Sequence, residues 1–422
     1  MGLLASAADS SLLKHRAFVA FWLARTCSSF GFQMFSVAVS WQVYALTNSA
    51  LALGIIGLMQ FLPSVLLALP AGHLADQYDR RRIALSGQLI EWLALLALVA
   101  LTLAHWADKT AIWGLVFMLA VAKALEGPAM QSLLPSLVPP VILARATAAN
   151  AAGSEAAVIV GPTLGGLLYV AGPAVVYSVS ALFYLIAIVL VGLLRYERPA
   201  QPRLPMTLPN LFAGISFIRA RKDVLGVISL DLFAVLLGGA TALLPIFARD
   251  ILHTGPWGLG LLRGAPSVGA LLVGIWLSRN KLEKHVGMIM FMSVAGFGAA
   301  TLVFALSTQL WLSLLALIAL GGFDMISMVI RGALVQLDTP DDMRGRVNAV
   351  NGIFINTSNQ LGEFESGLLA AWLGAAPAAV LGGIGTLVVV GLWMVLFPHL
   401  RRRQKLENEP VSAESPPRLS AE

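Results

Sequence analysis

The feature that most constrains this chain is a succession of long apolar segments, separated by short polar or charged junctions. Each segment can cross about 30 Å of hydrocarbon as an α-helix with a rise of about 1.5 Å per residue. Only helices are expected, because lipid cannot satisfy the hydrogen-bonding groups of an irregular backbone. We predict twelve spans, at residues 17–46, 50–74, 83–106, 110–135, 142–170, 173–194, 223–249, 257–278, 286–306, 310–336, 345–372 and 376–397.

The composition is incompatible with an ordinary soluble fold. Of 422 residues, 58% are hydrophobic and only 12% are charged, against about 25% charged in typical soluble domains. The single cysteine, Cys27, allows no intrachain disulfide. Residues 1–15 are mixed in character, and the run from Phe18 is too long for the apolar core of a cleavable signal. We expect this run to be retained as the first span.

The positive charges orient the predicted spans. If the N-terminus is cytoplasmic, 22 of the 28 Lys and Arg residues fall on the cytoplasmic side, two fall outside and four lie within spans. This asymmetry is a strong positive-inside signal, so the excess of cations requires no nucleic-acid partner. Tryptophans support the same frame, since a group of them falls at the predicted outer boundary: Trp41, Trp106, Trp113, Trp257, Trp311 and Trp372.

One long, proline-containing connection divides the spans six and six. We predict an all-α integral membrane protein with two pseudo-symmetric six-helix bundles, at 1–194 and 223–400. Residues 195–222 form the predicted cytoplasmic linker, and 401–422 a disordered cytoplasmic tail.

An internal repeat relates the fifth and eleventh spans. Adding 201 to five positions of the fifth span gives identical residues in the eleventh: Arg145 and Arg346, Asn150 and Asn351, Gly161 and Gly362, Gly166 and Gly367, Leu168 and Leu369. Two repeated halves with a substrate site between them, near the membrane midplane, are typical of secondary transporters.

The stretch GHLADQYDRRR, residues 72–82, lies between the second and third spans. It resembles the signature of the major facilitator superfamily through Gly72, Asp76, Arg80, Arg81 and Arg82. RGRVNAVN at 344–351 and SNQLGEFESG at 358–367 resemble the branch of enterobactin exporters and drug-efflux proteins. The resemblance covers residues 15–400 and implies the major facilitator fold, secondary transport and export.

Asp76 falls at the C-terminal end of its predicted span, where the helix dipole is unfavourable for an anion. It should therefore seek cations, either Arg80 or, from the other half, Arg344 or Arg346. We expect these contacts to latch the cytoplasmic side when the carrier opens outward.

GPTLGG, residues 161–166, resembles the antiporter motif of the same superfamily through Gly161, Pro162, Gly165 and Gly166. The resemblance implies a bias towards efflux. Tight packing of helices through small residues is the alternative interpretation.

Ionisable residues at membrane depth are candidates for function because burying a charge there is costly. The candidates for coupling or for the substrate cavity are Arg25, Lys123, Glu126, Glu155, Asp231, Arg263, Asp324, Arg331 and Glu363, with Glu91 in the same acidic set. Glu155 and Asp231 are preferred as proton carriers, because neither has an opposite charge within one helical turn. Static ion pairs between helices are the alternative.

The favoured function is a proton-coupled exporter of small organic molecules, such as a siderophore or drugs, acting as a monomer in the bacterial inner membrane. The chain contains no nucleotide-binding GxxxxGK[ST] pattern and no pattern of metal ligands, so no enzyme activity, metal or other cofactor is expected. An importer, a lipid-moving carrier and a non-transporting receptor or assembly partner remain alternatives. The substrate cannot be read from the sequence.

Overall fold

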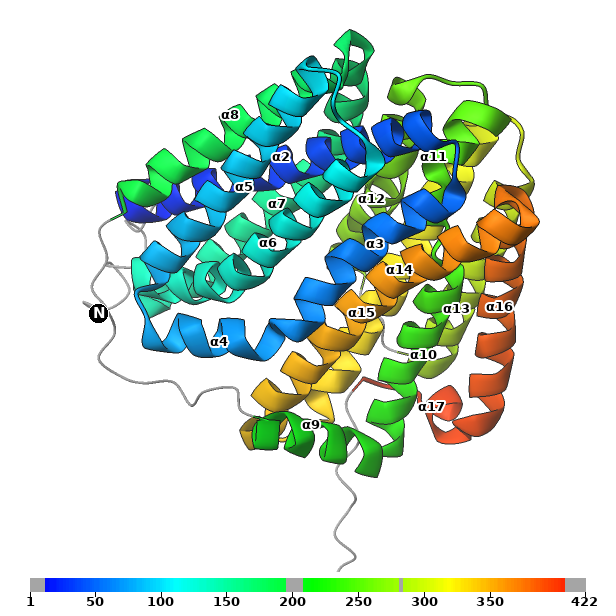
Figure 1. Cartoon of the computed structure of the whole chain (residues 1–422). Helices are drawn as coiled ribbons and strands as arrows, with labels where there is room; N and C mark the ends of the chain where they lie inside the picture. The colour runs from blue at the N-terminus through cyan, green and yellow to red at the C-terminus, as the bar shows by residue number, and fades with distance from the viewer. Residues whose placement is uncertain (1–11, 195–207, 281–283, 407–422) are drawn as a thin grey trace, which may run out of the picture.

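The computed structural model describes residues 12–194, 208–280 and 284–406, which are helical and contain no strand (Figure 1). The helices of the first half are α2 (Arg16–Thr47), α3 (Ala50–Leu66), α4 (Ala68–Gln77), α5 (Arg80–Leu103), α6 (Lys109–Leu137), α7 (Leu143–Leu168) and α8 (Pro173–Gly192). Those that follow are α9 (Leu208–Ala220), α10 (Lys222–Gly238), α11 (Leu244–Ile246), α12 (Pro256–Arg279), α13 (Val286–Leu306), α14 (Leu310–Leu337), α15 (Asp341–Leu373), α16 (Ala375–Leu396) and α17 (Pro398–Arg402).

Nine helical segments within the described residues are long and apolar enough to cross a membrane. Three further helices correspond to predicted spans. Of these, α3 has only 17 residues, whereas α2 and α15 have 32 and 33 but are less apolar. The all-helical membrane fold is confirmed, and the number of twelve spans stays a prediction.

The second predicted span, 50–74, is not one straight helix. α3 ends at Leu66, and α4 begins at Ala68 and turns away from the axis of α3 (Figure 1). Pro70 has no N–H to donate to the carbonyl of Leu66, so the helical hydrogen-bond ladder is interrupted there. The charged stretch 72–82 therefore follows a separate short helix.

The seventh predicted span, 223–249, is also interrupted. Regular helix ends at Gly238, and the chain continues through the short turns η4 (Ala240–Leu243), α11 and η5 (Phe247–Ile251). Adjacent glycines, Gly238 and Gly239, weaken a helix at this point. Irregular backbone at membrane depth is tolerated where it is buried or lines a cavity.

The helices form two groups that meet at one end. α2 packs on α7 and α8 in the first group, and α13 packs on α14 and α16 in the second, while α3 contacts α15 and α7 contacts α12 between the groups. One apolar core includes Val37, Leu98, Phe247 and Leu262 and so joins both halves. We call the end of the molecule at which this shared core lies the joined end. It carries the turn between α2 and α3.

At the opposite end, which carries α4 and α9, the two halves have separate apolar cores. Phe21 and Leu133 belong to the core of the first half, whereas Phe291 and Leu334 belong to that of the second. We call this the open end. The bundle boundaries 1–194 and 223–400 stay predictions.

Residues 401–406, the first part of the predicted tail, are described and make contacts with the second half. Arg403 donates to both carboxylate oxygens of Asp338, at the end of α14, over 2.5 and 2.8 Å, and both side chains are almost fully buried. The backbone N–H of Gly287 also donates to the carbonyl of Arg403. These contacts fix residues 401–406 against the open end, whereas 407–422 of the predicted tail and 195–207 of the predicted linker lie outside the described residues.

Candidate functional site

Glycine pairs close the joined end between the halves. A Cβ added at Gly54 of α3 would lie 3.1 Å from the Cα of Gly367 in α15. One added at Gly166 of α7 would lie 3.0 Å from the Cα of Gly260 in α12. Since Gly166 and Gly367 are related by the sequence repeat, equivalent positions make equivalent contacts between the halves. The pseudo-symmetry is therefore confirmed in the packing.

Three adjoining cavities run from the joined end towards the open end, with volumes of about 260, 300 and 370 Å³. The first and second share Phe32 and Gln60 in their walls, and the second and third share Ser64, Lys123 and Asn356. Their walls come from α2, α3, α4, α6 and α7 of the first half and from η4, α11, α12 and α15 of the second. Because neighbouring cavities share wall residues, we treat them together as the central cavity, whose lining mixes polar and apolar side chains.

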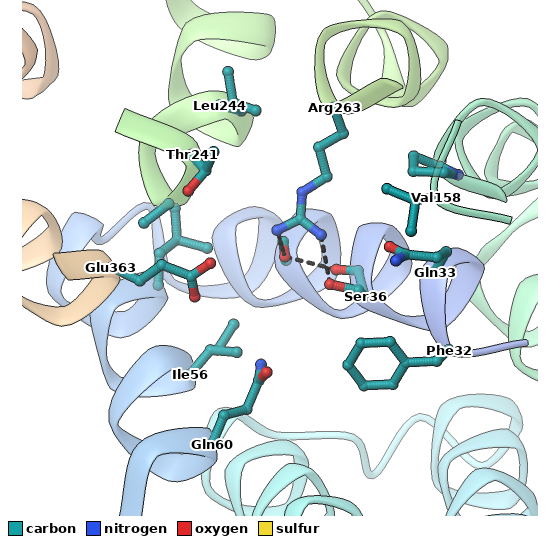
Figure 2. Close-up of a pocket in the computed structure, with 14 residues that line it drawn as sticks. Phe32, Gln33, Ser36, Ile56, Gln60, Val158, Thr241, Leu244, Arg263 and Glu363 are labelled. Carbon is teal, nitrogen blue, oxygen red and sulfur yellow. Dashed lines mark hydrogen bonds between the residues drawn. The ribbon is translucent and has the colours of Figure 1, made fainter. Parts of the chain in front are cut away.

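Arg263 lies at the joined end of this cavity (Figure 2). Its guanidinium donates to the hydroxyl of Ser36 at 2.5 Å and to that of Ser40 at 3.0 Å, both on α2. The bonds connect α12 of the second half with α2 of the first. Glu363 of α15 and Gln60 of α3 project into the same cavity, so this part carries both signs of charge and an amide.

Lys123 of α6 lies on the wall shared by the second and third cavities. Its ammonium nitrogen is 2.8 Å from the centre of the Phe32 ring, which is a cation–π contact. The Lys123 side chain is exposed, and the space that it faces is the second cavity. A cation is thus held against an aromatic face inside the cavity.

Glu126 faces away from that cavity, into the packing between α5 and α6, and is only 7% exposed. It accepts a 2.9 Å hydrogen bond from the side-chain amide of Gln88. Arg25 of α2 is close enough to interact electrostatically with both Lys123 and Glu126. The hydrogen-bond partner of Glu126 is thus an uncharged amide on the neighbouring helix, which charge spacing along the sequence does not reveal.

A second charged cluster lies in the second half. Asp231 of α10 forms an ion pair with Arg331 of α14, and a second guanidinium nitrogen of Arg331 is 3.8 Å from Asp324. Asp231 and Arg331 are mostly buried, whereas the side chain of Asp324 is 46% exposed. Asp231 has no cation near it in the sequence, but the fold supplies one.

Glu155 is exposed on α7. It shares a helix face with Ile159 and Thr163, which are four and eight residues on and contact α12 at Gly264 and Gly260. Glu155 therefore lies on the face of α7 that packs on α12, one turn nearer to the open end than the last residue in contact with α12.

The arginines of the charged stretch bind the ends of helices in their own half. Arg80 donates to the carbonyl of Ala75 in α4 at 3.4 Å and to that of Ser132 in α6 at 3.1 Å. Arg81 donates to the carbonyls of Val191 and Gly192 at the end of α8. Ala75, Val191 and Gly192 lie in the last turns of their helices, where a cation satisfies free carbonyls and complements the helix dipole, whereas Ser132 lies farther inside α6. Arg82 follows in the first turn of α5 and is exposed.

The predicted latch partners are only partly described. Gly72 and the backbone of Asp76 lie in α4, but the side chain of Asp76 lies outside the described part of the structure. Arg344 and Arg346 lie in the first turns of α15 at the open end, where a guanidinium nitrogen of Arg346 is 3.3 Å from the sulfur of Met343. The latch stays a prediction.

The glycines of the antiporter-like motif pack α7 against two different helices. Added Cβ atoms would lie 2.7 Å from the Cβ of Gln33 at Gly161 and 2.8 Å from the Cα of Met34 at Gly165, both on α2. Gly166 faces α12, and Pro162 lines the first cavity. The motif is therefore both a packing element and part of the cavity wall.

Several residues that build the site carry no charge and were not singled out by the sequence. Ser36 and Ser40 are four residues apart on α2, a spacing that places both on one helix face. At the joined end, the hydroxyl of Tyr44 donates to Asp250 across the halves. Such hydroxyls have no distinguishing sequence signal, because their partners are more than 200 residues away.

Comparison with known proteins places these features in a family. The profile of the family described as transmembrane secretion effector, a branch of the major facilitator superfamily, matches residues 7–422. The enterobactin exporter EntS of Citrobacter koseri is 27% identical over 395 residues, 93% of this chain and 94% of that protein. EntS of Escherichia coli O1:K1 is 26% identical over 408 residues, 96% of this chain and 98% of that protein.

Solved structures share the fold at low identity. A bacterial homologue of the iron transporter ferroportin, in an inward-facing state, has a TM-score of 0.65 and 18% identity over 93% of this chain and all of that one. A POT family transporter in complex with 5-aminolevulinic acid has a TM-score of 0.71 and 12% identity over 91% and 96% of the two chains. With the profile match over nearly its whole length, this multi-pass membrane protein belongs to the transmembrane secretion effector family of the major facilitator superfamily.

Proposed function

We propose that the protein is a proton-coupled exporter of small organic molecules and works by alternating access. The observation that carries the proposal is the central cavity, which lies between the halves and is closed at the joined end by glycine pairs. A cavity at the interface of two repeats is where transporters of this plan bind substrate.

The cavity lining favours an aromatic substrate with hydroxyl or carboxylate groups. Phe32 and Phe35 offer aromatic faces, and Gln60, Ser64 and Gln360 offer hydrogen bonds. Arg263 supplies donors at the joined end. Catecholate siderophores combine these chemical features, and the relatives named above are enterobactin exporters. We therefore propose a siderophore of this class as substrate.

The charge distribution supports a cytoplasmic position for the open end. The positive-inside rule places both chain termini, α4 and α9 on that side of a bacterial inner membrane. In the state described here, the cavity would therefore receive substrate from the cytoplasm. The protein would act as a monomer, because one chain supplies both halves of the cavity.

The alternate state requires closure of the open end, and we propose that Asp76 latches to Arg344 or Arg346 there. Asp76→Asn should sharply reduce transport, with expression and membrane insertion unchanged. Full activity of this variant would remove the latch and leave the arginines of the stretch with their helix-capping role.

Transport into inside-out membrane vesicles tests the function. With the vesicle lumen made acidic, the protein should accumulate enterobactin, and dissipation of the pH gradient should abolish accumulation. Vesicles without the protein provide the background, and the cationic dye ethidium tests a drug-efflux specificity. Accumulation of ethidium without enterobactin would contradict the proposed substrate, and accumulation of neither would contradict export.

A further inference from the structure

A pair of buried carboxyl groups lies behind the central cavity, between α5, α6 and α8. Glu91 of α5 is 1% exposed and Glu126 of α6 is 7% exposed. Gln88, three residues before Glu91 on the same face of α5, donates to Glu126, so both carboxyl groups lie at one contact between α5 and α6. Two ionised carboxylates cannot donate to one another, and like charges this close and this buried cannot both persist without compensation. The arrangement therefore calls for a proton between them.

Unpartnered atoms beside the pair point in the same direction. Oε2 of Glu91 and Oε1 of Gln88 are buried and have no hydrogen-bond partner, although the amide nitrogen of Gln88 donates to Glu126 at 2.9 Å. Gln88 is fully buried. Buried acceptors are normally satisfied, so a free oxygen of the Glu91 carboxyl group and a free amide oxygen beside it are consistent with a bound proton at this contact. Among the described residues no three His, Cys, Asp or Glu side chains are grouped to hold a metal ion. A proton fits between two carboxyl groups.

The charged and titratable groups around the pair come from two further helices, α2 and α8, and from α6 itself. Tyr184, which is 2% exposed, lies on α8, the helix that packs against α5. Lys123 of α6 interacts electrostatically with both carboxyl groups, and Arg25 of α2 interacts with Glu126. Two cations are therefore available to two carboxylates if the shared proton leaves.

Lys123 connects this buried pair to the substrate space. Its ammonium group lies against the ring of Phe32, and both residues line the second cavity. The face of Phe32 is also the surface on which an aromatic substrate would stack. Substrate and the Lys123 ammonium therefore compete for one aromatic face. Displacement from that face leaves the ammonium with the carboxyl pair as its nearest charged partner.

We propose that Glu91 and Glu126 form a proton-binding site and that Lys123 links its occupancy to aromatic substrate on Phe32. The proposal rests on the proposed function. With the cavity empty, the pair shares one proton. When substrate stacks on Phe32, Lys123 moves towards the pair and stabilises both carboxylates in their ionised form. The O–H bond then breaks, and the proton passes to water in the cavity. The charge of the pair changes from −1 to −2, facing Lys123 and Arg25.

The proton itself can be tested without substrate. Infrared difference spectra of the purified protein should show a protonated carboxyl C=O band at neutral pH that is lost in both Glu91→Gln and Glu126→Gln. Asp108→Asn is the matched control on α6, since Asp108 is an exposed helix cap for which asparagine substitutes well. Loss of this band in the two Gln variants but not in the control supports the site. An unchanged band in both Gln variants would overturn it.

The link to substrate is tested by proton release. In weakly buffered detergent solution, enterobactin binding to the unmodified protein should release about one proton per molecule bound, as linkage requires. Release should vanish in Glu91→Gln, Glu126→Gln and Phe32→Leu, whereas Asp108→Asn should behave as the unmodified protein. Phe32→Leu leaves the pair intact, so it remains informative if a Gln variant fails to fold.

Transport assays of the same variants in vesicles distinguish failure of the proton site from failure of the proposed function on which it rests. The Gln variants should lose accumulation driven by a pH gradient but keep exchange of enterobactin across vesicles at equal pH. If the unmodified protein neither binds nor moves enterobactin, the proposed substrate fails, and the infrared result still decides the proton site. If it moves enterobactin and both variants accumulate it normally, the proton site is wrong.

Discussion

Arg263 is one of the residues at which polar side chains of the two halves meet inside the cavity; Ser64, which donates to Gln360 at 2.7 Å, is another. The guanidinium of Arg263 holds two serine hydroxyls of α2, and each of these is a hydrogen bond to a charged group. Such bonds contribute about 1.5–3 kcal/mol each. Release of Ser36 and Ser40 is therefore a required step when the joined end opens. The guanidinium of Arg263 is then free to donate to a polar group of the substrate.

Substitution of Arg263 should impair transport in steps. Arg263→Lys keeps the charge but cannot hold two hydroxyls in a planar fork, so the rate of enterobactin accumulation should fall about tenfold. Arg263→Gln removes the charge and should lose about a hundredfold. Lys109→Gln, which removes an exposed cation at the start of α6, is the control. Initial rates in inside-out vesicles measure the effect, and a normal rate in Arg263→Gln would contradict this role.

Charge at membrane depth selected candidate residues from the sequence but could not assign their partners. Arg263, Lys123 and Glu363 line the cavity, and their role in transport stays a prediction. Asp231 stood alone in the sequence, yet Arg331 lies beside it one hundred positions later. Ion pairs between helices depend on tertiary packing, and local spacing carries no information about them.

At the scale of helices, glycine decides how the halves meet. The contacts of Gly54 with Gly367 and of Gly166 with Gly260 bring helix backbones together without intervening side chains. Small residues at such interfaces permit close van der Waals packing, which drives helix association in lipid. The two glycine pairs are therefore the seal of the joined end.

A single methyl group should loosen this seal. Gly166→Ala and Gly260→Ala introduce a Cβ about where the opposing helix lies, at a cost of about 1–3 kcal/mol. Transport should fall severalfold, with more of the protein open at the joined end. Gly391→Ala is the matched control, because a Cβ there meets nothing within 4 Å. Cross-linking or transport assays that fail to distinguish Gly166→Ala from Gly391→Ala would refute the seal.

The chain segment after α16 should contribute stability rather than transport chemistry. Arg403→Ala leaves Asp338 buried without its cation, which should cost about 3–5 kcal/mol, whereas the apolar pair Arg403→Met with Asp338→Leu should cost far less. Thermal unfolding in detergent measures both. Equal unfolding temperatures for Arg403→Ala and the unmodified protein would show that the pair is dispensable.

Helix existence was predictable from apolar length, but helix continuity was not. The spans at 50–74 and 223–249 satisfy the length rule, yet Pro70 and the pair Gly238–Gly239 interrupt them. Proline and glycine are tolerated within membrane helices when neighbouring helices or a cavity accept the freed backbone groups. Whether they break a helix is decided by those neighbours.

At the scale of the whole molecule, the sequence repeat predicted two related halves, and the packing of α7 and α15 confirms the relation. The repeat could not predict which end is closed. That asymmetry comes from the arrangement of apolar cores, which are shared at the joined end and separate at the open end. The proposed alternating access would be an exchange of these two arrangements.

Spin-label distances across both ends test this account most directly. Cys27→Ser removes the single native cysteine, and exposed sites then accept labels in pairs, at Tyr78 and Gly345 for the open end and at Leu46 and Trp372 for the joined end. On addition of enterobactin, a second population should show a shorter open-end distance and a longer joined-end distance. Asp76→Asn should suppress that population. Distances that stay fixed, or that change in the same direction at both ends, would contradict alternating access.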